Sequence, residues 1–182
     1  METQTTTKTI WNLDATHSEV GFKVKHMMIT NVSGSFGKFD VTVQTEGDDF
    51  RTANIDFSAE LDSISTGNGD RDNHLKSGDF FDTAKYPRLG FRSTKLVKKD
   101  DGSFTLHGDL TIRDVTKPVK LDVEFGGIAK DPWGNEKSGF TITGKINRTD
   151  FNLNWNAALE TGGVLVSEEV KLYAEVQLIK KA

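Results

Sequence analysis

The feature that most constrains this chain is a two-residue alternation of apolar and polar side chains, repeated along most of its length. In the stretch ANIDFSAEL (residues 53–61), every second residue is apolar and most residues between are polar. Successive side chains of a β-strand point to opposite faces, so the pattern predicts strands with one dry face and one wet face. About nine stretches carry it: residues 9–14, 20–26, 36–43, 53–61, 89–96, 104–112, 119–125, 140–146 and 170–178.

Turn signals separate these stretches, among them KKDDGS (98–103) and DPWGNEKSG (131–139). Strands of this kind suit an antiparallel sheet with a polar outside and an apolar inside. A closed barrel is favoured because it leaves no exposed edges, and a two-sheet sandwich is the competing architecture. We therefore expect an all-β single domain over residues 1–182, with residues 1–8 frayed.

One polar insert, Thr66 to Phe91, interrupts the alternation. Asn68 is suited to capping a helix, two aspartates follow in the first turn, and Gly78 is suited to ending the helix. The sequence therefore predicts a short inserted helix near residues 69–77. A second interruption, residues 155–169, is expected to be a long loop or a short helical turn.

The inserted helix is too short to be stable alone, so it must pack on the barrel. Leu75, Phe80 and Phe81 are its natural apolar anchors. Asp70 lies four residues before His74, and Asp72 lies four residues before Lys76, so both pairs are spaced to interact across one turn.

The chain has no cysteine, which excludes disulfides, thiolate metal sites and cysteine catalysis. Its net charge is −4 and no basic stripe stands out, so nucleic acid is not an expected partner. The N-terminal residues carry no signal peptide, which predicts a cytoplasmic protein as the sequence stands. A trimmed N-terminus would instead be compatible with a periplasmic or secreted protein.

Catalytic patterns are weak, and we expect a non-enzymatic protein without a metal site. The histidines form neither an HxH nor an HExxH pattern, and no G-x-S-x-G motif is present. One alternative remains open, a metal-dependent enzyme in which His17, His26 and His74 converge.

The interior offers the clearer signal, because the inward phase of the strands is rich in Phe, Val, Ile and Leu. Small residues in that phase, including Gly108, Gly144 and Ala174, would leave room for an apolar guest. The same residues suit an ordinary packed core, in which case the barrel would be a protein-interaction module.

Several motifs add up to a resemblance that runs from about Trp11 to about Leu178. TGNGDRDNHLKSGDFFDTAKYP (66–87) and LTIRDVTKPV (110–119) are the most specific of them. In these motifs the chain resembles the YceI-like family of polyisoprenoid-binding proteins. The resemblance implies a lipocalin-like, eight-stranded antiparallel β-barrel with an internal tunnel.

The resemblance also implies a function: binding, storage or transport of an isoprenoid chain, a quinone tail or a fatty amide. It implies a homodimer and a link to stress response, and transient membrane contact is compatible with such a role. No cofactor is expected other than the bound lipid.

The predicted site combines inward-facing strand positions with the insert. The expected ligand-binding residues are Phe22, Val24, Phe39, Ile55, Phe57, Leu75, Phe81, Phe91, Leu110, Leu121, Val123, Phe125, Phe140, Ile142, Leu172 and Val176. Arg71, Asp72, His74 and Lys76 are expected to fasten the insert to the barrel or to meet a polar head group.

Overall fold

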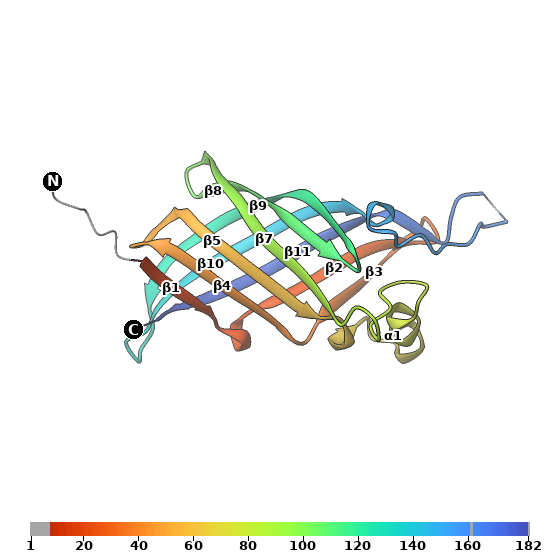
Figure 1. Cartoon of the computed structure of the whole chain (residues 1–182), viewed down its shortest axis with the longest axis horizontal. Coiled ribbons are helices and arrows are strands. Elements are labelled where there is room, and N and C mark those ends of the chain that lie inside the picture. The colour runs from red at the N-terminus through yellow and green to blue at the C-terminus, as the bar shows by residue number, and fades with distance from the viewer. Residues whose placement is uncertain (1–7, 161, 182) are drawn as a thin grey trace.

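The computed structural model describes residues 8–160 and 162–181, and its main feature is an elongated, closed antiparallel β-barrel (Figure 1). The strands are β1 (Lys8–Leu13), β2 (Glu19–His26), β3 (Thr30–Phe36), β4 (Phe39–Glu46), β5 (Asp49–Glu60), β6 (Ile64–Ser65), β7 (Arg88–Asp100), β8 (Ser103–Ile112), β9 (Val115–Lys130), β10 (Glu136–Asn147) and β11 (Val166–Lys180). The helix is α1 (Gly69–Lys76), and the 3-10 turns are η1 (Ala15–His17), η2 (Leu61–Ser63) and η3 (Arg148–Phe151).

Two positions in the barrel wall are each filled by two strands that follow each other, β1 with β2 and β3 with β4. β11 pairs with β10 along one edge, and along the other edge it pairs first with β2 and then, nearer its C-terminus, with β1. β3 and β4 likewise follow each other and pair with β2 and β1. With β1 counted together with β2, β3 counted together with β4, and the two-residue β6 at the edge of β3 left out, eight strands close the barrel, as predicted. The competing sandwich is therefore wrong.

Each of the nine alternating stretches lies largely in one strand, but β3, apart from Phe36, and β6 were not predicted. In the sequence of β3, TNVSGSF, Gly34 lies between Val32 and Phe36 in the inward phase, so the apolar period is interrupted there. The frayed N-terminus was predicted one residue too long, because Lys8 begins β1 and pairs with Glu46. Residues 1–7 lie outside the described part of the chain.

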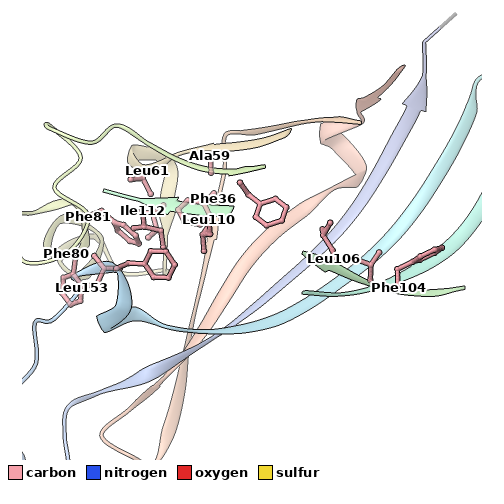
Figure 2. Packing of buried hydrophobic residues seen from close by; sticks show 14 residues of the cluster. Phe36, Ala59, Leu61, Phe80, Phe81, Phe104, Leu106, Leu110, Ile112 and Leu153 are labelled. Carbon is pink, nitrogen blue, oxygen red and sulfur yellow. The ribbon is translucent and has the colours of Figure 1, made fainter. Parts of the chain in front are cut away.

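The buried side chains form two clusters toward opposite ends of the barrel. Near β1, Trp11 is fully buried and its ring lies 5.0 Å from that of Phe50. The other cluster reaches α1, where Leu61, Phe81 and Leu153 gather (Figure 2). In the same view, Phe104 and Leu106 of this cluster lie well apart from that group, farther along the barrel.

Candidate ligand-binding cavity

Between the two ends the barrel encloses a cavity of about 590 Å³. This volume lies in the range of about 300–1,000 Å³ that is usual for small-molecule sites. The inward side chains of β2, β5, β7, β8, β9, β10 and β11 form most of its wall. Ala174 and its neighbours on β11 show the pattern, since Val170, Leu172, Val176 and Leu178 also line the cavity.

Most of the residues predicted from the sequence as ligand-binding do line this cavity. They are Phe22, Val24, Ile55, Phe57, Leu75, Phe81, Phe91, Leu110, Leu121, Val123, Phe140, Ile142, Leu172 and Val176. Their contact with a ligand stays a prediction.

Phe39 and Phe125 were also predicted as ligand-binding, but they do not line the cavity. The Phe39 ring packs on Phe57 at 6.3 Å. Phe125 stacks on Phe140 at 5.2 Å, beside a register shift between Gly139 and Phe140. Both rings therefore support side chains of the wall instead of facing the cavity.

Phe50 shows the opposite error, because it lines the cavity although alternation would turn it outward. The inward residues of β5 run through Ala53, Ile55 and Phe57, so Phe50 is out of phase with them. A register shift between Gln44 and Glu46 in the pairing of β4 with β5 changes the phase at this point. The sequence signal is weak, since only the preceding turn residues hint at a bulge.

The small residues of the wall do not all leave free space, which corrects the prediction for Gly108 and Gly144. A Cβ on Gly108 would lie 2.3 Å from Cζ of Phe91. A Cβ on Gly144 would lie 2.4 Å from Cδ2 of Leu121. These glycines accommodate large neighbouring side chains, and Ala174 remains the clearer case of a small residue facing the cavity.

The predicted helix is present as α1, and Asn68 caps it by accepting a hydrogen bond from the Arg71 amide at 3.0 Å. Thr66 ties the helix to the preceding strand. Its amide and hydroxyl donate to Asp72 Oδ1 at 2.9 and 2.6 Å, and its carbonyl accepts from Arg71 Nη2 at 2.8 Å. Arg71 and Asp72 are thus held to Thr66 at the start of the insert, and their role in fastening the insert to the barrel stays a prediction.

The two ion pairs predicted within the helix do not form. His74 Nε2 pairs with Asp79 Oδ2 at 2.9 Å instead of with Asp70. Asp72 is engaged by Thr66, and the Lys76 backbone carbonyl accepts from the Thr83 amide. Contacts with the flanking segments therefore replace the pairs that helical spacing alone would favour.

Polar groups of the cavity wall gather at the α1 end. Asp70, Arg71 and His74 line the cavity there together with His26 of β2. Asp70 and Arg71 are also exposed to solvent, so the cavity reaches the surface beside α1. Asp72 and Lys76 lie outside the wall. The His74 ring stands edge-on to Trp155 at 4.7 Å, which links α1 to the segment before β11.

Arg148 is the residue of this end that the sequence did not reveal. Its side chain is 4% exposed and donates hydrogen bonds to four backbone carbonyls, those of Leu153, Trp155, Val166 and Ser167. Burial lowers the pKa of the guanidinium, although it stays charged. Arg148 thus holds η3, residues 153–155 and the start of β11 together. The sequence showed only a turn motif here.

The three histidines of the alternative metal site do not meet. His17 Nδ1 contacts Asp14 Oδ2 at 2.9 Å in η1, whereas His74 pairs with Asp79 in the insert. β2 separates His17 from His26 along its whole length. Among residues 8–160 and 162–181, no three His, Asp or Glu side chains converge in a metal-ligating group. In the same part of the chain, no helix has the length and hydropathy to cross a bilayer.

Comparison with known proteins assigns the chain to a family. A model described as the YceI-like domain matches residues 11–178. UPF0312 proteins of Staphylococcus aureus are 42% identical (strain RF122) and 41% identical (strain COL) over 170 residues, covering 93% of this chain and 96% of each relative.

Solved structures agree. The crystal structure of a Campylobacter jejuni YceI protein has a TM-score of 0.76 at 35% identity and covers 100% of both chains. BcnA of Burkholderia cenocepacia has a TM-score of 0.77 at 21% identity, covering 91% of this chain and 98% of its own. A polyisoprenoid binding domain of Saccharophagus degradans has a TM-score of 0.64 at 16% identity, with 94% and 98% covered, and these last two share the fold. The chain belongs to the YceI-like family.

Proposed function

We propose that this protein binds a long isoprenoid or similar lipid chain inside the barrel and stores or carries it. The observation that supports this most directly is the apolar cavity of about 590 Å³, whose polar groups gather at one end. A slender apolar chain with a single polar end matches that distribution. The fold shared with a polyisoprenoid binding domain favours an isoprenoid among lipid chains.

The affinity would come from partition of the chain out of water. Each buried methylene group contributes about 0.8 kcal/mol, so even a modest apolar chain supplies most of the binding free energy. Wall residues such as Phe57, Leu121 and Leu172 would contact this chain. Their exact shape matters less than their being apolar, because hydrophobic burial is not directional.

The polar end of the ligand would lie beside α1. Arg71 and His74 carry donors on the cavity wall there, while Arg148 adds a buried positive charge behind them. Hydrogen bonds at this end would orient the ligand, since each contributes only about 1 kcal/mol net. Lys76 lies outside the wall and is not included.

Native mass spectrometry of the purified protein, repeated after organic extraction, tests the proposal. A bound species with an isoprenoid or long acyl chain is expected. An empty protein that also takes up no added polyprenol or quinone would contradict the proposal and favour the interaction module.

A pair of variants locates the site. Phe57→Glu places a charge on the cavity wall and should abolish retention of the lipid. Val97→Glu is the matched control, because Val97 is exposed on β7 and does not line the cavity. Equal retention by the two folded variants would contradict the location.

A further inference from the structure

The turn between β2 and β3 carries three consecutive large apolar residues in an exposed position. Met27, Met28 and Ile29 are 43%, 52% and 77% exposed. The turn follows His26, which lines the cavity, and so it lies at the rim of the end where the cavity reaches the surface. Large apolar side chains gathered at one exposed tip mark a surface for a partner or a membrane.

The backbone of this turn disfavours the residues it carries. Met27 and Met28 have φ values of 52° and 64°, and the Ile29 amide donates to the His26 carbonyl at 3.2 Å. Two central residues with positive φ define a type I′ hairpin turn, for which Asn-Gly is the preferred pair. Methionine at both positions is unfavourable for folding, which makes this turn a candidate for a role other than stabilising the fold.

A second hairpin-like segment extends the tip. Residues 157–160 and 162–165 contain one charged residue, Glu160, and pair through Ala158 and Val164. The Met27 amide donates to the Leu165 carbonyl at 2.8 Å, and Met28 Cγ lies 3.2 Å from the position of a Cβ on Gly163. We call Met27–Ile29 and these two stretches the apolar rim. It projects from the same end of the barrel as α1 (Figure 1).

Below the apolar rim, lysines lie side by side across three strands. Lys171 of β11 stands directly opposite Lys145 of β10 and Lys23 of β2. Lys25 follows toward the tip, exposed on the same face as Lys23. Like charges in directly opposite positions repel one another, so an anionic partner would stabilise this arrangement.

Two acidic residues lie nearby on β11. Glu169 forms an ion pair with Lys145 at 3.5 Å, and Glu168 is exposed. We call Lys23, Lys25, Lys145 and Lys171 the lysine row. These four lysines outnumber the two carboxylates of β11, so this surface below the apolar rim carries a net positive charge.

We propose that the apolar rim inserts into the headgroup region of a bilayer containing anionic phospholipids, with the lysine row against the headgroups. An apolar tip above a basic collar is the distribution that such a surface recognises. The cavity then faces the membrane, and a lipid chain passes between them without crossing water. This last use of the contact rests on the proposed function, while the docking itself does not.

The sharpest test is a variant that removes the apolar side chains and improves the turn. Met27→Asn/Met28→Gly supplies the residues that a type I′ turn prefers, so the melting temperature should be kept or raised. Its binding to vesicles of phosphatidylcholine with phosphatidylglycerol, measured by flotation, should fall about tenfold or more relative to the unmodified protein.

A matched control lies at the other end of the barrel. Trp133 is 82% exposed in the turn between β9 and β10, and Trp133→Glu should leave vesicle binding unchanged. Lys23→Glu/Lys25→Glu should weaken binding to the mixed vesicles and remove its dependence on salt. Vesicles of phosphatidylcholine alone should bind the unmodified protein more weakly.

Two results would overturn the docking proposal: no flotation of the unmodified protein with mixed vesicles, or equal flotation of the Met27→Asn/Met28→Gly variant. These results are separable from failure of the proposed function. A protein that retains lipid but ignores vesicles would refute the docking alone. One that floats with vesicles but carries and takes up no lipid would refute the proposed function alone.

Discussion

Ala174→Phe separates a lipid container from a packed barrel more directly than any other single change. Ala174 lies in the middle of β11, opposite Ile142 on β10 and Val20 on β2, and its small side chain faces the cavity. A phenylalanine at this position would project its ring into the space that the proposed lipid chain occupies.

The two interpretations predict opposite changes in stability. In a packed core, the added ring would cost about 1–3 kcal/mol through overpacking. In the cavity, the ring finds room and its burial offsets the change, so the free energy of unfolding should stay the same or rise by up to about 2 kcal/mol. If the ring displaces roughly four methylene groups of the ligand, binding should weaken by about 3 kcal/mol, or about 100-fold.

Urea unfolding of the lipid-free protein measures the first quantity, and titration with a polyprenol measures the second. Ala59→Phe is the matched comparison, because Ala59 is 1% exposed in the core and does not line the cavity. It should lose about 1–3 kcal/mol of stability. The reasoning is refuted if Ala174→Phe destabilises the protein as much as Ala59→Phe does, or if it binds the lipid as well as the unmodified protein.

Three further changes test the supporting structure. Arg148→Met should lower the free energy of unfolding by about 2–4 kcal/mol in urea titrations, because four backbone carbonyls lose their hydrogen-bond donor. Removal of the buried charge offsets only part of this loss. The exposed Arg71→Met is its control, and an equal effect of both would contradict the role of Arg148. Gly108→Ala should lower the free energy of unfolding by about 1–3 kcal/mol, because the added methyl group would clash with the Phe91 ring. Gly139→Ala is the control, because a methyl group there meets open space and should lower the stability less. Thermal melts compare the two variants. Hydrogen bonds to its carboxylate hold the pKa of Asp14 well below its usual value, and the largest effect comes from Lys137 Nζ, which donates at 2.8 Å. This contribution to stability is complete above the unfolded pKa of about 4 and is lost as the pH falls below it. Asp14→Asn should therefore reduce the loss of unfolding free energy at acid pH by about 2 kcal/mol. An unchanged plot of unfolding free energy against pH would contradict the pairing.

The barrel itself could be predicted from the sequence, because the period of a strand is local. Each apolar residue of a stretch such as 170–178 faces the same side whatever the rest of the chain does, and all five of its inward residues line the cavity. The cap of α1 was equally predictable, since Asn68 acts on an amide three residues away.

Other features of the cavity depend on contacts between distant segments, and only the tertiary structure decided them. A register shift between β4 and β5 turns Phe50 inward, and the local sequence gives only a weak signal of it in the preceding turn residues. His74 takes Asp79 as its partner instead of Asp70, because the segment after α1 folds back onto the helix.

Arg148 shows the same limit most clearly. Its four acceptors are backbone carbonyls, which every residue type carries, so no sequence pattern distinguishes them. The sequence by itself determined most of the side chains that face inward, and hence that the interior is apolar. Whether those side chains meet or leave a cavity was decided by the closure of the barrel, because free volume depends on how distant strands are spaced.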